Sequence, residues 1–172
     1  KVFLGLTLAV MAVLMVAVGN SVTRHGIHLP EPAARVDPTT LEATAPWNAP
    51  GVTVDEDGTV RVTMVAAAWS YRPNEITVPT GATVVFEVST PDVIHGLKVL
   101  DTNINAMVIP GQVSRVVHTF DEPGEHLIVC HEYCGIGHQA MFGTIVVADG
   151  AVPGPAPEQP AAQADAPGEG DA

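Results

Sequence analysis

One stretch of twelve residues near the end of the chain, from Cys130 to Met141, concentrates side chains that bind metals. It holds two thiols, two imidazoles, one carboxylate and one thioether, supplied by Cys130, Cys134, His131, His138, Glu132 and Met141. Thiolate, imidazole and thioether ligands together favour copper, and less often zinc. Gly135 and Gly137 let the backbone turn tightly between ligands. The composition of this segment therefore predicts a soft-metal site.

An upstream histidine, His95, adds a further imidazole, and four interpretations of the set compete. A Cys130–Cys134 disulfide, which an exported compartment allows, leaves the histidines and Met141 without a role. Structural zinc takes both cysteines, His95 and His138, and Met141 again stays unused. A mononuclear blue copper site needs one cysteine and leaves the second without a role.

A dinuclear copper centre is the interpretation that uses every soft ligand. The two thiolates bridge two coppers, and each copper takes one imidazole. A thioether and a backbone carbonyl from the loop between the cysteines supply two weak axial ligands. The six predicted ligands, one of them a backbone carbonyl (that of Glu132), are His95, Cys130, Glu132, Cys134, His138 and Met141.

The elements that must hold these ligands are β-strands. Short runs rich in Val, Ile and Thr, most of them alternating between apolar and polar residues, are separated by turn signals such as Pro79-Thr80-Gly81. The runs are 59–66, 75–79, 82–89, 95–100, 113–120, 125–130 and 142–148. A domain over residues 59–148 with this pattern predicts an all-β sandwich or barrel of the Greek-key type.

An apolar segment precedes this domain. Val2 to Gly19 contains no charge and no proline, and as a helix it spans about 27 Å, close to the roughly 30 Å of a bilayer core. We expect one transmembrane helix over residues 1–23. A secretory signal peptide is the alternative, because Ala17 and Gly19 are small residues at cleavage-like spacing. Both interpretations carry the domain to the extracytoplasmic face of the cell membrane.

Two proline-rich segments flank the predicted domain. Residues 24–58 contain five prolines, which rule out long helices, so we expect a linker there. Within it, Trp47 either packs against the domain or lies at the membrane interface. Residues 149–172 hold five prolines, five acids and no Lys or Arg, which predicts a disordered acidic tail rich in Pro, Ala and Gly.

The overall composition excludes several classes of protein. The 172 residues include 7 basic and 19 acidic side chains, a formal net charge of −12, so nucleic-acid binding is not expected. Two cysteines cannot make a multi-disulfide scaffold. Outside the tail and the apolar segment, acids still outnumber bases. They either steer a basic partner toward the domain or serve solubility, with docking on an apolar patch beside the ligand loop.

The ligand motifs resemble a known family. The string C-x-E-x-C-G-x-G-H-x-x-M at 130–141, with S-x-P-D-V-I-H at 89–95, resembles the CuA domain of cytochrome c oxidase subunit II. The single apolar helix and the stretches at 35–40, 102–105 and 141–147 are similar to the ba3-type, B-family haem–copper oxidases. The resemblance runs from Lys1 to about Val147 and implies a cupredoxin β-barrel that binds two copper ions as a CuA centre.

The resemblance also implies a role and partners. Such a subunit lies against membrane lipid and accepts electrons one at a time from cytochrome c or a similar carrier. It passes them to a low-spin haem in catalytic subunit I, where O₂ is reduced and protons are pumped. The chain would then be a subunit of an oxidase, with haem only in its partner. The alternative function is a copper storage or delivery protein of cupredoxin fold, whose site would be exposed and exchangeable.

Two positions depart from the family's pattern. Many relatives carry a run of aromatic residues for electron entry where this chain has a single tryptophan, Trp69, in Ala66–Tyr71. Trp69 is therefore the electron-entry candidate, with a core or rim role as the alternative. In mitochondrial-type relatives a glutamate at the position of Glu132 also binds Mg²⁺, whereas the ba3-type position is similar to an amide. A Mg²⁺ site at the Glu132 carboxylate is thus a further hypothesis.

Overall fold

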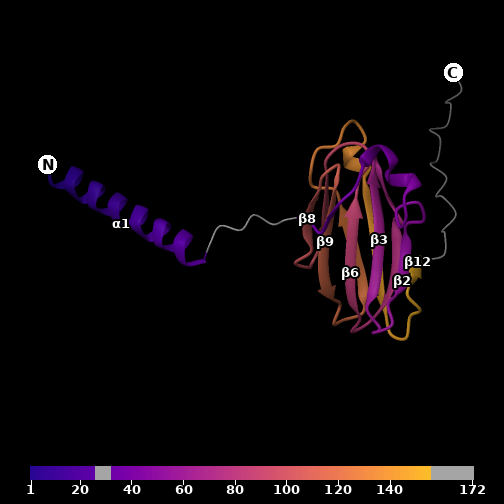
Figure 1. The fold of residues 1–172 in the computed structure, drawn as a ribbon. Helices are drawn as coiled ribbons and strands as arrows, with labels where there is room; N and C mark the ends of the chain where they lie inside the picture. The colour runs from indigo at the N-terminus through magenta and orange to yellow at the C-terminus, as the bar shows by residue number, and fades with distance from the viewer. Residues whose placement is uncertain (26–31, 156–172) are drawn as a thin grey trace, which may run out of the picture. The chain divides into compact units, whose positions relative to one another are not determined.

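The chain divides into two compact units, Lys1–Glu31 and Pro32–Ala172. In this computed structural model, residues 1–25 and 32–155 are described, and Figure 1 traces them from the N-terminal helix through the strands of the second unit. The first unit contains one helix and the second contains the β-domain. Each is described by itself below.

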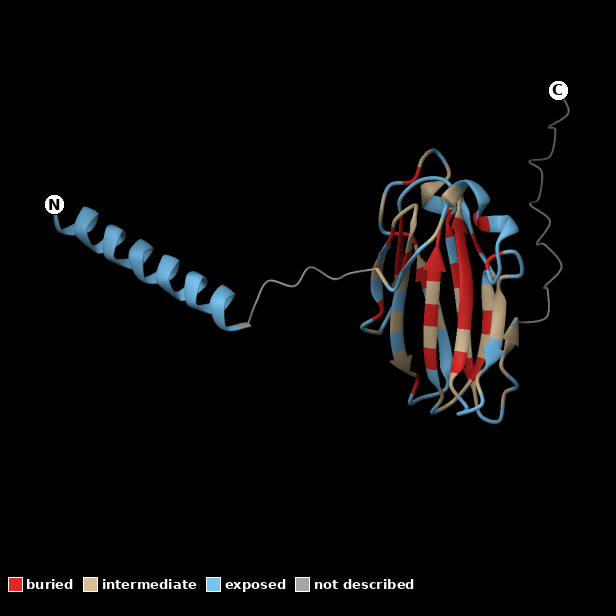
Figure 2. Cartoon of the chain, in the orientation of Figure 1, coloured by how far each residue is buried: buried red, intermediate tan, exposed pale blue. Residues whose placement is uncertain are grey.

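The first unit is helix α1, Val2–His25. Residues Val2–Arg24 have a mean hydropathy of 2.6, and a helix of this length spans about 35 Å. Figure 2 shows the helix exposed along its described length. The helix is therefore long and apolar enough to cross a bilayer, in agreement with the segment predicted over residues 1–23.

The second unit is built from two six-stranded sheets. The first sheet has the order β1-β9-β6-β3-β2, with β4 paired to β3, and the second has the order β12-β5-β11-β10-β7-β8. The pairs β3–β6 and β5–β11 are parallel, and the other pairs are antiparallel. The strands are β1 Ala34–Arg35, β2 Gly51–Val54, β3 Val60–Ala67, β4 Ser70–Arg72, β5 Glu75–Pro79, β6 Thr83–Ser89, β7 His95–Val99, β8 Asn105–Val108, β9 Gln112–Thr119, β10 Gly124–Val129, β11 Phe142–Ala148 and β12 Gly154–Pro155.

The core lies between the two sheets. Alternating side chains point inward from both sheets, so that β5 and β11 bury every second residue, and Figure 2 shows the same alternation of buried and part-exposed residues along strands of the domain. Large side chains in this core include those of Tyr71, Phe86, Met64, Ile76, Leu97 and Ile128. This is the all-β, cupredoxin-like architecture that the strand pattern and the family resemblance predict.

All seven predicted runs form strands, with bounds that differ by one residue at most. They correspond to β3, β5, β6, β7, β9, β10 and β11. The five strands that the sequence pattern did not predict have two to four residues each. Such short strands are defined by pairing with a neighbour, so they leave little hydrophobic periodicity to detect.

The linker predicted over residues 24–58 is corrected by the structure, because residues 32–58 belong to the folded unit. Strand β1 pairs with β9, β2 pairs with β3, and a 3₁₀ helix, η1, spans Pro38–Ala43. Leu41 and Trp47 are buried against Val65 and Val113. Proline excludes long α-helices here, but it does not exclude a 3₁₀ turn or a short edge strand.

The predicted tail also differs at its start. Residues 149–155 are part of the domain, and β12 pairs with β5 through Gly154 and Pro155. Residues 156–172, the rest of the predicted acidic tail, lie outside the described residues.

Candidate metal centre

The ligand loop runs from Cys130 to Met141 and joins β10 to β11. These two strands are antiparallel neighbours, with Val129 opposite Phe142. The Cys130 N–H donates to the Met141 carbonyl at 3.3 Å, which closes the loop at its base. A short 3₁₀ helix, η2 His138–Ala140, turns the chain back toward β11. The loop therefore starts and ends on rigid strands.

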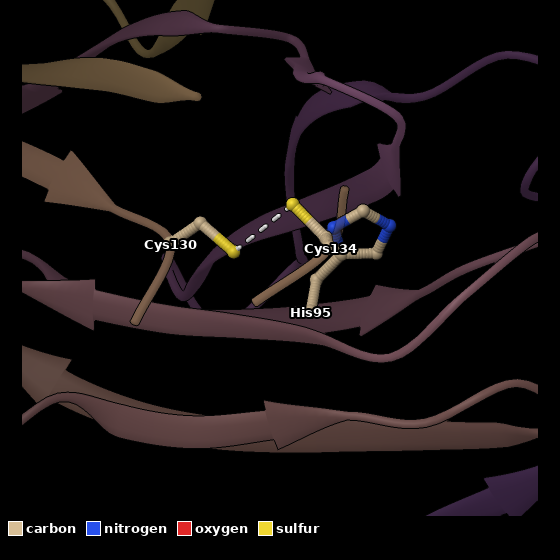
Figure 3. Close-up of side chains that lie close together, drawn as sticks. All are labelled: His95, Cys130 and Cys134. Atoms are coloured by element: carbon tan, nitrogen blue, oxygen red, sulfur yellow. Dashed lines mark hydrogen bonds between the residues drawn. The ribbon is translucent and has the colours of Figure 1, made fainter. Parts of the chain in front are cut away.

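The two sulfurs of the loop face each other in the protein interior. Cys130 Sγ lies 3.8 Å from Cys134 Sγ, and both side chains are free thiols. Figure 3 shows the two sulfurs turned toward one another, with the His95 imidazole beside them. Cys134 Sγ is also 3.5 Å from His138 Nδ1 and 3.7 Å from Met141 Sδ. Five of the predicted side chains thus converge on one small volume.

His95 is the ligand candidate that comes from a different strand. It begins β7, its side chain is fully buried, and its ring lies within 4.8 Å of both sulfurs. Its Nε2 pairs with Asp92 Oδ1 at 2.8 Å, while Nδ1 is buried without a hydrogen-bond partner in the described part of the chain. Nε2–H donation to a carboxylate leaves the Nδ1 lone pair free. A buried, orphaned acceptor beside two thiols is what a metal ligand requires.

Asp92 is a functional residue that the sequence analysis did not single out. Its carboxylate accepts hydrogen bonds from the His95 ring, the Ala68 N–H, the Thr90 hydroxyl and the Val93 N–H. Partial burial acts to raise the pKa of Asp92, but these hydrogen bonds, that from His95 first among them, hold it below its usual value. The side chain is thus an anion that orients the His95 imidazole. An aspartate three residues before a histidine was the available signal.

Glu132 contributes its backbone to the same cluster. Its carbonyl oxygen accepts a hydrogen bond from the Cys130 thiol at 3.1 Å, which brings the carbonyl beside the sulfurs. Its side chain is half-buried. Within residues 1–25 and 32–155, the one group of three or more His, Cys, Asp or Glu ligand atoms is His95, Cys130 and Cys134. The Glu132 carboxylate is not a member of that group, so the described residues give the Mg²⁺ hypothesis no support.

Trp69 lies over the loop. Its Nε1–H donates to the Cys134 carbonyl at 3.1 Å, and its ring fills the space where a Cβ on Gly135 or Gly137 would be. An ideal Cβ on Gly137 would come within 2.4 Å of the indole. The side chain is 41% exposed. Trp69 therefore reaches from the surface to the backbone of the ligand loop.

Burial favours the protonated thiol of Cys134 in the absence of metal. Desolvation, followed by the neighbouring Cys130 thiol, raises the pKa of Cys134 to about 11. Metal binding must then displace protons from the thiols. Sulfurs that are 3.8 Å apart are not bonded to each other, since a disulfide bond measures about 2.05 Å. The buried set of thiol, imidazole, thioether and carbonyl donors fits copper in its chemistry.

Comparisons with known proteins identify the family of the chain. Residues 52–149 match the family model described as cytochrome c oxidase subunit II, periplasmic domain. A cytochrome c oxidase subunit 2 of Thermus thermophilus is 45% identical over 151 residues, covering 86% of this chain and 90% of the relative. A second such subunit from Thermus thermophilus is 53% identical over 115 residues, covering 66% and 85%. A solved haem–copper terminal oxidase dimer contains a chain that matches with a TM-score of 0.57 and 30% identity, covering 86% of this chain and 97% of that one.

The fold and the cluster of soft donor atoms define a cupredoxin-like domain that follows an apolar helix. The chain belongs to the cytochrome c oxidase subunit II family, as its motifs predicted, and it is most like the ba3-type members. Membership of this family implies copper of the CuA type. It also implies that the chain is a subunit of an oxidoreductase complex, with electron entry as its general role. It also fits a single-pass membrane protein with its domain outside the cytoplasm.

Proposed function

We propose that this chain binds two copper ions as a CuA centre and is the electron-entry subunit of a haem–copper oxidase. It accepts electrons from cytochrome c or a similar carrier and passes them to the low-spin haem of catalytic subunit I. That partner reduces O₂ and pumps protons. The observation that carries the proposal is a pair of buried, facing thiols with the orphaned Nδ1 of His95 beside them.

The proposed ligands are six atoms from five side chains and one carbonyl. Both thiolates would hold the two coppers, and His95 and His138 would each supply one imidazole. The contacts of Cys134 Sγ with His138 and Met141, and of Cys130 Sγ with the Glu132 carbonyl, support this set. The six proposed ligand atoms belong to His95, Cys130, Glu132 (through its carbonyl), Cys134, His138 and Met141. The chemistry that bound copper would supply here is one-electron transfer, with the charge change shared between the metals and the thiolate sulfurs.

The protein's own contribution is to hold these donors and to keep water out. Met141 is 2% exposed, Cys134 7% and Cys130 8%, so solvent reaches the cluster poorly. Asp92 fixes the tautomer and the direction of the His95 ring. Strands β7, β10 and β11 place the ligands on a rigid frame, which limits reorganisation when charge changes.

Trp69 remains the candidate for electron entry. Its ring is part-exposed, and its indole N–H reaches the carbonyl of Cys134, a proposed ligand residue. The exposure of the ring and the hydrogen bond support a short connection between the surface and the cluster. Docking of the donor at this face, with the apolar helix held in membrane lipid, completes the proposed arrangement.

Burial disfavours the alternative of copper storage or delivery. An exchangeable site needs ligands that a partner can reach, whereas His95 is fully buried and both thiols are nearly so. The set also includes two facing thiols fixed between strands, which a carrier does not need. Slow exchange of bound copper with a chelator is expected, and fast exchange would favour the carrier function.

Copper stoichiometry and electron paramagnetic resonance of the second unit, residues 32–155, test the proposal. We expect two coppers per chain and a seven-line hyperfine pattern from one electron shared by two copper nuclei. One copper per chain with a four-line signal would contradict the dinuclear assignment. Glu132→Gln keeps the backbone carbonyl and should leave the spectrum nearly unchanged, whereas loss of copper in this variant would assign the ligand to the side chain.

A further inference from the structure

A tyrosine that the ligand set does not use lies directly behind the cluster. Tyr71, in β4, is 1% exposed and belongs to the main core. Its hydroxyl donates to the carbonyl oxygen of Gly96, in β7, at 2.5 Å. Gly96 follows His95 in the chain. The hydroxyl therefore fixes the backbone at the residue next to a proposed ligand.

The other side of Gly96 faces the sulfurs. The Gly96 N–H donates to Cys130 Sγ at 3.4 Å. The ring of His131 lies against the same residue, because an ideal Cβ on Gly96 would come within 2.7 Å of three ring atoms. Hydroxyl, imidazole and sulfur thus confine one glycine from different directions. The N–H···S hydrogen bond depends on where this glycine is held.

The hydroxyl of Tyr71 is a dependable donor. The side chain is buried, and the ordinary pKa of a phenol is near 10. The phenol stays protonated over the whole physiological range. A phenol O–H without a partner in the core would be costly, so the contact with the Gly96 carbonyl is held strongly.

We propose that Tyr71 is a positioning residue of the metal centre: its hydroxyl holds the Gly96 backbone so that the Gly96 N–H donates to the Cys130 sulfur and raises the reduction potential of bound copper. Hydrogen bonds to a cysteine sulfur draw electron density away from the metal and favour its reduced form. This inference rests on the copper centre proposed above. It assigns to a core residue a role that packing alone would not require.

Tyr71→Phe in the full chain, purified in detergent and loaded with copper, tests the proposal. The variant keeps the ring and removes only the hydroxyl. At a fixed applied potential near the midpoint, we expect the ratio of oxidised to reduced centre to rise roughly two- to tenfold, the range of one hydrogen bond. Copper content should stay at that of the unsubstituted chain. An unchanged potential would overturn the proposal.

Ser89→Ala is the matched control. Ser89 is also fully buried, and its hydroxyl also donates to a backbone carbonyl, that of Gln112 at 2.8 Å. It is not among the residues that contact the sulfurs. The variant loses a comparable buried hydrogen bond and should leave the potential unchanged. An equal shift in both variants would show a general effect of core loosening and would overturn the specific role of Tyr71.

A fluorinated tyrosine keeps the proposal testable if Tyr71→Phe fails to fold. The chain has two tyrosines, so biosynthetic 3,5-difluorotyrosine in a Tyr133→Phe background labels Tyr71 alone. The fluorinated phenol is a stronger donor of nearly the same shape. The potential should rise relative to the Tyr133→Phe parent. A fall or no change would contradict the proposal.

A metal-free readout separates this proposal from the copper assignment. In the metal-free full chain, amide hydrogen exchange at peptides covering Gly96 should be faster in Tyr71→Phe than in the unsubstituted chain and in Ser89→Ala. If exchange is faster in Tyr71→Phe but the unsubstituted chain binds no copper, the contact between Tyr71 and Gly96 is supported and the proposed function is rejected. Normal copper binding with unchanged exchange and potential would retain the function and reject the role of Tyr71.

Discussion

The two ends of the β-domain have opposite surfaces. The metal end, formed by the turn between β3 and β4, the start of β7 and the ligand loop, exposes apolar side chains: those of Trp69, Val93, Ile94, Tyr133, Ile136 and Phe142. The acidic end, formed by the opposite ends of the same strands, exposes carboxylates: those of Glu56, Asp57, Asp101, Asp121, Glu122, Glu125 and Asp149. Exposed apolar residues such as Val54 and Val152 also occur at the acidic end, but the exposed aromatic rings of the domain lie at the metal end.

This difference decides between two interpretations of the acidic composition. Acids near the ligand loop would attract a basic electron carrier, whereas distant acids serve solubility and leave docking to apolar contact. At the metal end, Asp92 is engaged by four hydrogen bonds and Glu42 is paired with Arg72. The exposed ring of Tyr133 and the exposed side chain of Ile136 dominate that surface. The distribution of charge favours an apolar docking face.

The largest expected effect at the metal end is the loss of a bridging thiolate. Cys130→Ser or Cys134→Ser should abolish the mixed-valence centre, because each sulfur is proposed to contact both metals. Copper content and the paramagnetic spectrum measure the loss. Asp121→Asn, at the acidic end, is the control and should bind copper normally. A seven-line spectrum that persists in either serine variant would refute the bridging role.

Removing the charge that orients His95 comes next. Asp92→Asn replaces the carboxylate by a weaker acceptor for the His95 ring N–H, and its amide N–H₂ would face the N–H and O–H donors that Asp92 now accepts from. We therefore expect copper affinity to fall about 10- to 100-fold. Competition with a chelator of known affinity measures the change. Asp101→Asn, an exposed acid of the other end, removes the same charge. Equal losses in the two variants would mean that net charge, and not the contact with His95, governs affinity.

Substitutions at one glycine of each end compare how tightly the two ends are packed. Gly137→Ala forces a Cβ to within 2.4 Å of the Trp69 ring, whereas a Cβ on Gly124, at the acidic end, meets open space. We expect Gly137→Ala to lower the free energy of unfolding by about 1–3 kcal/mol. Gly124→Ala should leave it within about 1 kcal/mol, with a small gain from reduced freedom of the unfolded chain. Urea unfolding of the metal-free domain measures both, and equal values would show that Trp69 does not confine the loop.

The smallest expected effect is that of salt on electron entry. With the acids at the far end, the rate at which a basic cytochrome c reduces the domain should change less than about threefold as the Debye length shortens from about 30 Å at 0.01 M to 10 Å at 0.1 M. Stopped-flow measurement over this range is the test. A steep fall of this rate with increasing salt would instead support steering of the donor by the acidic residues. Ile136→Ser should slow the reaction more than Asp121→Asn does.

The strands were predictable from sequence, because β3, β6 and β11 are long enough to show alternation between turn signals. The extent of the domain was not. Strands β1 and β12 have two residues each and are defined only by pairing with β9 and β5. Proline content predicts the absence of long helices, but it gives no information on pairing between strands that are far apart in the sequence.

The proposed ligands were predictable because five of the six fall in one loop with metal-binding spacing, and the structure brings them together with His95. The residues that hold them were not. Tyr71 lies 25 residues from Gly96, and Trp69 lies 65 residues from Cys134. Which hydroxyl or indole reaches which carbonyl depends on the packing of two sheets, and no local pattern encodes it.

The indole over Gly135 and Gly137 also constrains how such chains can diverge. The ring at position 69 occupies the volume that a side chain at position 137 would need, and it lies close to position 135. The tryptophan and the loop glycines therefore cannot be substituted independently of one another. Where the turn between β3 and β4 carries a small residue, the loop is free to acquire a side chain at position 137, whereas position 135, with φ +117°, still favours glycine. Where it carries tryptophan, the first viable step in drift is at position 69. Substitutions at positions 69 and 137 should therefore accumulate in a fixed order along a lineage.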